Sequence, residues 1–239
     1  MKCCTFLLFV ALPIYFYGQQ TDSDMVLYQS DLLLITSKKA IYKNDTIYNA
    51  NVEEKKILKE NNAQELVKQG IRPYVYVTYA PLSLVGNALS YKRNMADYWG
   101  GHPTAFSTIT TINVATQEPY NILNIVDETS LLTAIKNDPY VKKLCGIDTL
   151  KLQQAKTFKE ALNLLNNQIQ YPENQFTVYS YTILGYSEVE NKVALRLIRK
   201  KPRMGNFTRY LQLGLKATPT QAFKEKLQQP DVFFLGTYK

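Results

Sequence analysis

Strand-like and helix-like segments occupy separate stretches of this chain, and this separation constrains its fold more than any other feature. Short runs of β-branched and aromatic residues predict strands mainly toward the two ends, whereas amphipathic helical patterns gather in the middle. A parallel sheet requires a crossover between successive strands, and this order of segments does not supply one each time. We therefore expect an α+β fold in which several helices pack on a mainly antiparallel sheet.

Local signals place the expected strands. Two prolines, Pro73 and Pro81, should bound the clearest of them, which covers residues 74–79. Two strands of the C-terminal third should form a hairpin whose long turn covers residues 185–191. The expected strands are 32–35, 40–42, 46–48, 74–79, 108–114, 176–184, 192–198, 210–215 and 231–235.

The expected helices begin where a capping residue precedes an amphipathic pattern. The N-terminal one, over residues 52–69, contains a pair of asparagines that can interrupt it. Four more helices are expected. The first is capped by Asp127 or Thr129 and contains Ile135, and the second runs from Asp138-Pro139 to Gly146. The third runs from the Thr157–Glu160 capping box to before Pro172, and the fourth is short and covers residues 219–227.

The first eighteen residues have the outline of a secretory signal peptide. Lys2 supplies a positive start, residues 6–17 are apolar and uncharged, and Gly18 precedes a polar stretch. The apolar run is about a dozen residues long, short of the ~20 that a spanning helix needs. We expect residues 1–18 to be removed, residues 19–25 to form a flexible lead-in, and residues 26–239 to fold as one domain. A subdomain boundary, if the domain has one, falls near residues 117–127.

Charge and hydropathy limit the partners of the exported chain. No second long apolar run follows the leader, so we expect no transmembrane span in the mature chain. The formal net charge is +8, which suits an anionic surface such as lipid headgroups or acidic glycan, although solubility is the simpler role. Because export separates the protein from nucleic acid, we expect no nucleic-acid partner.

Cysteine and histidine are too scarce for most catalytic and metal sites. Of three cysteines, Cys3 and Cys4 lie in the leader, so Cys145 remains alone and no intramolecular disulfide forms in the mature chain. The single histidine, His102, leaves too few ligands for a zinc site built on several His and Cys side chains. Neither a calcium-loop spacing nor a phosphate-binding glycine loop occurs. We therefore expect no metal and no cofactor, and we assign no catalytic residue.

Tyrosine is unusually abundant, with 18 residues against a single tryptophan. The period of a strand places Tyr74, Tyr76 and Thr78 on one face and the residues between them on the other. Tyrosine buries a large area and keeps a polar tip, so it suits a recognition surface. Tyr74 and Tyr76 are therefore candidate binding residues for a partner protein or glycan, with packing inside the sheet as the alternative.

The segment from Asp97 to Pro103 contains the single Trp and the single His. Gly100 and Gly101 give it backbone freedom, Trp99 offers an apolar face, and His102 can exchange a proton near neutral pH. Trp99 and His102 are thus candidates for ligand binding. In a hydrolase reading, Asp97 orients His102 and the nucleophile is Ser107 or Ser90, although neither serine lies in a nucleophile-elbow pattern. The simplest interpretation is that residues 97–103 form only a turn.

A basic stretch follows in the C-terminal third. Strand alternation places Lys192, Arg196 and Lys200 on one face, opposite Val193, Leu195 and Leu197. Arg196 and Lys200 are therefore candidates for binding an anionic surface, with a solvated face as the alternative.

These features favour an exported, non-enzymatic binding protein of the periplasm, the cell envelope or the medium, which recognises a partner protein or a glycan. One alternative is a hydrolase with its site around Asp97 and His102. Another is a secreted inhibitor or immunity-type protein that occupies the cleft of an enzyme.

Overall fold

The computed structural model describes residues 24–145, 149–167, 175–200, 210–228 and 233–234. It contains antiparallel sheets and several helices, which confirms the α+β class. The leader, residues 1–18, and residues 19–23 of the expected lead-in lie outside the described residues. The last two lead-in residues contact the first sheet: Asp24 lies 3.5 Å from the ammonium of Lys39, and the carbonyl of Met25 accepts a hydrogen bond from Ser37 N.

The N-terminal region is a four-stranded meander followed by two helices. The expected short strands are confirmed and one more precedes them: β1 (Val26–Gln29), β2 (Leu33–Thr36), β3 (Lys39–Tyr42) and β4 (Asp45–Asn49). The expected helix is also confirmed, as α1 (Ala50–Glu60) and α2 (Ala63–Lys68). Its break lies at the two asparagines, where Asn62 adopts a left-handed conformation with φ of 51°. Asparagine tolerates this conformation better than most residues, which explains why the helix ends there.

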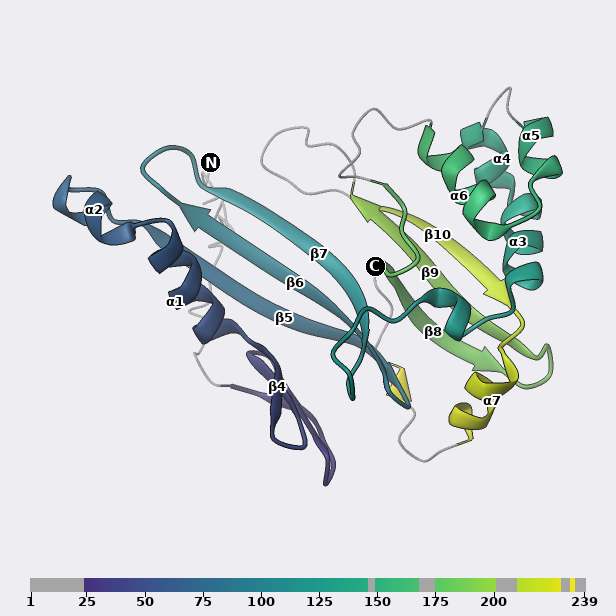
Figure 1. Cartoon of the computed structure of the whole chain (residues 1–239), viewed down its shortest axis with the longest axis horizontal. Coiled ribbons are helices and arrows are strands. Elements are labelled where there is room, and N and C mark those ends of the chain that lie inside the picture. Colours follow the sequence, from purple (N-terminus) through teal and green to yellow (C-terminus); the bar gives the residue numbers. More distant parts are fainter. Residues whose placement is uncertain (1–23, 146–148, 168–174, 201–209, 229–232, 235–239) are drawn as a thin grey trace, which may run out of the picture.

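Three long strands form the second sheet: β5 (Tyr74–Val85), β6 (Ala88–Tyr98) and β7 (Thr104–Asn113). The short strand β11 (Phe233–Phe234) pairs with the end of β5, so the order is β11-β5-β6-β7. Figure 1 shows α1 lying across β5, with the three long strands side by side. The sequence did not predict β6, because its polar centre hides the alternation of a strand.

The expectation that Pro81 ends β5 is wrong. The strand continues to Val85 through an irregularity in its register with β6 between Pro81 and Ser83. The amide hydrogens of Val77 and Tyr79 bond to Glu54 and Ser37, away from β6. By alternation the nitrogen of Pro81 faces the same edge, where β5 needs no donor for β6. A proline is therefore tolerated within this strand.

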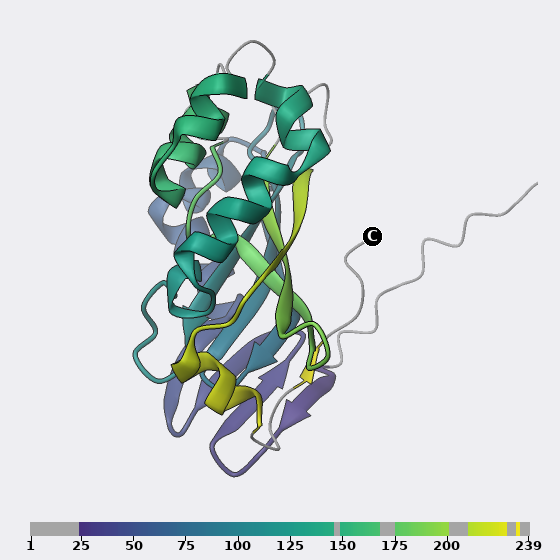
Figure 2. The same cartoon turned by 90° about the vertical axis from the view of Figure 1, so that its right-hand side faces the viewer.

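The C-terminal region places a helical group against a third sheet. Its helices are η1 (Ile122–Asn124), α3 (Glu128–Asn137), α4 (Pro139–Cys145), α5 (Thr149–Gln154), α6 (Phe158–Asn167) and α7 (Gln221–Leu227). Its strands β8 (Tyr181–Ser187), β9 (Lys192–Lys200) and β10 (Tyr210–Ala217) have the order β10-β9-β8. Figure 1 shows α3–α6 on the side of this sheet that faces away from β5–β7, and Figure 2 views the molecule from these helices.

The capping signals of the C-terminal region are confirmed. The carboxylate of Asp127 accepts from Ser130 N and that of Asp138 from Val141 N, both at 2.8 Å, so Asp127 rather than Thr129 caps α3. Thr157 accepts from Glu160 N at the start of α6. The short helix α5 was not expected.

The strand boundaries of this region differ from the expectation. The predicted long turn at 185–191 is wrong, because residues 185–187 continue β8. β8 also starts later than predicted, at Tyr181, and the expected final strand is seen only as β11. Residues 231, 232 and 235 of that strand lie outside the described residues.

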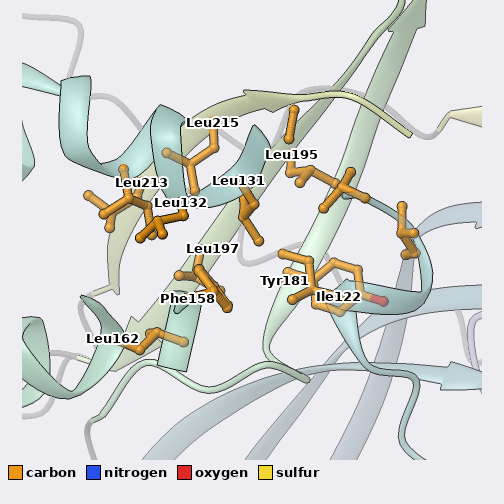
Figure 3. Close-up of a cluster of buried hydrophobic side chains, with 14 of the residues drawn as sticks. Ile122, Leu131, Leu132, Phe158, Leu162, Tyr181, Leu195, Leu197, Leu213 and Leu215 are labelled. Atoms are coloured by element: carbon orange, nitrogen blue, oxygen red, sulfur yellow. The ribbon is translucent and has the colours of Figure 1, made fainter. Parts of the chain in front are cut away.

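Buried apolar side chains form two clusters. One joins the meander, α1 and the inner face of β5–β7; the other joins α3–α6, α7 and the inner face of β8–β10 (Figure 3). Apart from Val85 and Ala88, which belong to the second cluster, the chain passes from the first cluster to the second between Val114 and Ile122. The two parts are linked, however, since Thr111 Oγ1 of β7 donates to the carbonyl of Tyr181 in β8 at 2.7 Å.

Candidate functional site

The two faces of the β5–β7 sheet differ in burial. Along β5 the burial alternates from Tyr74 onward, with Val75, Val77 and Tyr79 buried and Tyr74 and Tyr76 exposed. This confirms the predicted division of the strand into two faces. Tyr74 and Tyr76 are 46% and 43% exposed. Tyr74 also makes the cross-strand contact that the alternative interpretation predicts, with the ring of Tyr98.

Strand register extends this exposed face across β6 and β7 in three rows. Tyr74 lies opposite Tyr98, with ring centroids 5.8 Å apart. The next row is Tyr76, Ala96 and Ala105, and the third is Thr78, Asn94 and Ser107. We call these eight residues the tyrosine face: Tyr74, Tyr76, Thr78, Asn94, Ala96, Tyr98, Ala105 and Ser107.

Hydrogen bonds hold the third row of the tyrosine face in place. Asn94 Nδ2 donates to Thr78 Oγ1 at 3.3 Å, and Ser107 Oγ donates to Asn94 Oδ1 at 2.7 Å. An amide has two N–H donors and a hydroxyl can both donate and accept, so this row keeps capacity for a further partner. The tyrosine face therefore combines aromatic rings with neutral, oriented hydrogen-bonding groups.

The opposite face of the same sheet is closed by α1. Arg93 Nε donates to Glu53 Oε1 at 2.7 Å, the Arg93 guanidinium forms an ion pair with that carboxylate, and the hydroxyl of Tyr79 donates to it as well. Burial lowers the pKa of Arg93, but its hydrogen bonds to Glu53 outweigh this effect and raise the pKa overall. This network joins α1 to two strands and gives the tyrosine face a rigid support.

Tyrosines also fill the buried side of the sheet. The rings of Tyr48 and Tyr79 stack with centroids 4.0 Å apart, and Tyr91 lies against both. Burial, together with Glu53 for Tyr79, raises the pKa of Tyr48 and of Tyr79 well above the ordinary value of 10.0. The hydroxyl of Tyr48 donates to the carbonyl of Thr36 at 3.3 Å, so burial does not leave this polar tip without a partner.

Helix α1 and the meander also occupy the edge of β5. Glu54 Oε1 accepts a hydrogen bond from Val77 N at 2.7 Å, and the carbonyl of Ser37 accepts from Tyr79 N at 3.3 Å. Backbone donors on an open strand edge invite pairing with another chain. Glu54 and Ser37 therefore satisfy two backbone donors on this edge.

The predicted Trp99–His102 segment connects β6 to β7. Trp99 is half-buried and packs against the first apolar cluster, whereas His102 is exposed. Gly100 has φ of +98°, and a Cβ there would lie 3.0 Å from Ile71 Cδ1, so this glycine lets the connection fold back toward the start of β5. Trp99 thus supports the end of the sheet on the side opposite to Tyr98.

The groups of the hydrolase reading are engaged elsewhere. Asp97 accepts a hydrogen bond from the hydroxyl of Thr104, its neighbour across the hairpin. Ser90 is buried and its hydroxyl lies 2.8 Å from that of Thr111, whereas Ser107 bonds to Asn94. None of the contacts seen in the described residues joins His102 to a serine or a carboxylate.

The basic stretch is only partly exposed. Lys192 Nζ donates to Ser130 and Thr218, at 3.0 and 2.8 Å, instead of pointing freely into solvent. Arg196 is half-buried, and its Nη1 atom has no hydrogen-bond partner among the described residues. Lys200 ends β9, and its side chain lies outside the described residues. The opposite face of β9, with Val193, Leu195 and Leu197, is buried as predicted.

Three hollows on the described surface are lined by residues other than the predicted ones. One of about 520 Å³ lies between α1 and α2 and is lined by Leu58, Asn62 and neighbouring lysines. In the described ranges, no group of three or more His, Cys, Asp or Glu side chains is placed to hold a metal ion. None of the helices in the part of the chain that the structure describes has the length and apolar character needed to cross a bilayer.

The tyrosine face has six members that were not among the predicted binding residues, and three of these six are Tyr98, Asn94 and Ser107. Ser107 was considered only as a nucleophile. Asn94 and Tyr98 lie on β6, and Ser107 lies on β7 opposite Asn94. Because β6 was not predicted, these residues could not be predicted either. Gly86, whose φ of +53° marks the β5–β6 turn, together with Asn87, was the signal that could have revealed this hairpin.

Comparison with known proteins places the chain in no established family. No family model matches it, and no curated protein matches it. It is similar at a low level to a crystal structure of a member of the DUF3298 family from Bacteroides fragilis, with 11% identity and a TM-score of 0.29. The match covers 73% of this chain and 63% of that chain, so less than two thirds of the other protein is matched. A likeness this distant assigns no function.

Proposed function

We propose that this protein is an exported, non-enzymatic binding protein that recognises a partner protein or a glycan through the tyrosine face. The observation that carries the proposal is the exposure of Tyr74 and Tyr76 on strand β5, whose other face is buried beneath α1. Tyrosine provides large contact area at a low cost in conformational entropy, particularly on a rigid element. The leader outlined by residues 1–18 supports export.

The support beneath the rings favours binding over a purely structural role. Leaving the apolar surface of large rings in water costs free energy, about 25 cal/mol per Å². The ion pair and hydrogen bonds of Glu53 fix the strands under these rings. Rings held in this way lose little entropy when a ligand packs against them.

The double change Tyr74→Ala/Tyr76→Ala tests the function. Tagged protein is exposed to the envelope fraction of its native host, and the captured material is measured with and without the change. We expect the variant to capture at least about tenfold less, which corresponds to about 1.4 kcal/mol. Tyr140→Ala is the matched control, because Tyr140 is 43% exposed and lies on α4.

The far-UV circular dichroism and melting temperature of each variant show that it is folded. Unchanged capture by the folded double variant would remove the tyrosine face from the proposal. Export is tested separately by intact mass: we expect the protein recovered from the periplasm or the medium to have the mass of residues 19–239. A full-length mass in the cytoplasm would contradict export.

A further inference from the structure

The chemistry of the tyrosine face narrows the ligand class. We infer that the ligand is a neutral saccharide chain, which lies across β5–β7 with sugar rings against Tyr74, Tyr76 and Tyr98 and hydroxyls bonded to Asn94 and Ser107. This inference rests on the proposed function and specifies its ligand.

The rows of the tyrosine face suit a ligand that is itself a thin chain. Ala96 and Ala105 continue the row of Tyr76 across the sheet. Their methyl groups stand less far from the backbone than the rings on one side or the polar side chains on the other. A ring seated over these alanines would meet Tyr76 at its edge and the hydroxyl and amide groups of the third row along its side.

Saccharides present the two chemistries that this face offers. One face of a sugar ring carries C–H groups that pack on an aromatic ring, and its rim carries hydroxyls that both donate and accept hydrogen bonds. Thr78, Asn94 and Ser107 are bonded to one another and retain unused donors and acceptors at fixed positions. Donors and acceptors that are already oriented discriminate strongly for hydroxyl-bearing ligands, because a ligand without hydroxyls would leave them unpaired.

The charge of the face indicates a neutral ligand. None of its eight residues is ionisable near neutral pH. The neighbouring charged side chains Arg93 and Asp97 belong to the opposite face, where they contact Glu53 and Thr104. Lys92 lies one row away toward β8, outside the eight residues, and is half-buried. An anionic polymer would find little compensation for its charges on this surface.

A protein partner fits these side chains less well. The cores of protein interfaces are enriched in Met and Arg as well as aromatic residues, and they exclude water with large side chains. Around its three rings, the tyrosine face has only Ala, Thr, Asn and Ser. These small and mostly polar side chains suit a hydrated, hydroxyl-rich ligand.

Isothermal titration calorimetry of the purified protein tests this inference. The probes are four neutral hexasaccharides, of β-1,4-glucan, α-1,4-glucan, β-1,4-mannan and chitin, and the neutral polysaccharide fraction of the native host's envelope. Polygalacturonate serves as the anionic comparison. We expect at least one neutral probe to bind, and polygalacturonate not to bind.

Substitutions then locate the bound sugar. We expect Tyr76→Ala to weaken binding about tenfold or more, equivalent to about 1.4 kcal/mol, and Asn94→Ala to weaken it about fivefold. Tyr76→Phe, which keeps the ring, should remain within about twofold of the unchanged protein, and Tyr140→Ala should have no effect. The melting temperature of each variant separates loss of the site from loss of the fold.

Each contrary outcome overturns either the saccharide inference or the proposed function, or both. If no neutral probe binds but Tyr74→Ala/Tyr76→Ala still abolishes capture of a protease-sensitive partner, the saccharide is rejected and the proposed function stands. If a neutral probe binds equally well to Tyr76→Ala and Asn94→Ala, its site is elsewhere and the inference fails. If neither a saccharide nor a host partner depends on these residues, both proposals fail together.

Discussion

The two faces of the β5–β7 sheet carry the same kinds of residue in opposite environments. On the covered face, Tyr79 is 8% exposed, stacks on Tyr48 and donates its hydroxyl to Glu53. On the other face, Tyr74 and Tyr76 lie within five positions of it and remain exposed. The difference follows from α1 and the meander, which cover the face of Tyr79, whereas β8 covers the other face at Ser83 and Thr111 and leaves Tyr74 and Tyr76 exposed. A tyrosine therefore becomes part of the core or part of a surface according to what the fold places above it.

Substitutions of the covered and the exposed tyrosines should differ most in their effect on the stability of the protein. Tyr79→Ala removes a buried ring, a stacking partner of Tyr48 and the hydroxyl bonded to Glu53, so we expect a loss of about 3–5 kcal/mol in the free energy of unfolding. Tyr76→Ala, on the exposed face, should change it by no more than about 0.5 kcal/mol. Urea denaturation of both variants measures this difference, and equal losses in the free energy of unfolding would contradict it.

The Glu53 network should contribute the next largest effect. Glu53→Ala leaves the partly buried Arg93 and the Tyr79 hydroxyl without their acceptor, which we expect to cost about 2 kcal/mol. Glu60→Ala is the matched control on α1, because its carboxylate lies exposed 3.8 Å from Lys56 and should contribute less than about 0.5 kcal/mol. Equal midpoints for the two variants in urea would show that the network does not hold α1 on the sheet.

Alkaline pH should destabilise the protein through Tyr79 on the covered face. Since burial raises the pKa of Tyr79 in the folded state above the ordinary value of 10.0, the folded protein holds this proton more tightly than the unfolded chain. Its contribution to stability is therefore complete below pH 10 and is lost as the pH rises above that value, by up to about 1.4 kcal/mol per pH unit. Urea denaturation between pH 9 and about pH 11 should show a shallower decline for Tyr79→Phe, and identical slopes would contradict this account.

The edge of β5 should show the smallest effect. Glu54→Ala removes the acceptor of Val77 N, with an expected cost of about 1 kcal/mol, whereas Glu54→Gln keeps an acceptor and should cost less. The Val77 amide should exchange with deuterium about fivefold faster in the alanine variant, as measured by NMR. An unchanged exchange rate in Glu54→Ala would mean that this hydrogen bond does not protect the strand edge.

Short-range signals predicted much of the fold. The capping residues Asp127, Asp138 and Thr157 act within three residues of themselves, and all three make the expected hydrogen bonds. The asparagine break between α1 and α2 depends only on local backbone conformation. These predictions succeeded because the atoms involved are neighbours along the chain.

Predictions failed where a distant partner decides the structure. β6 has a polar centre, so its identity as a strand depends on pairing with β5 and β7 rather than on its own hydropathy. Pro81 was expected to end β5, yet its nitrogen faces an edge away from β6. Five of the eight residues of the tyrosine face, including Tyr98 and Asn94, lie on β6 or β7 and could not be proposed without this pairing.

By itself, the sequence determined that Tyr74 and Tyr76 share a face opposite Val75 and Val77, because side chains alternate along any extended strand. It could not determine which face would be covered. That depended on Glu53, which lies 26 residues before Tyr79 and 40 before Arg93, and on the meander that supplies Tyr48. Only the tertiary structure decided this, because contacts between distant segments form when the chain closes, and they left three tyrosine rings on the open face beside the neutral polar row.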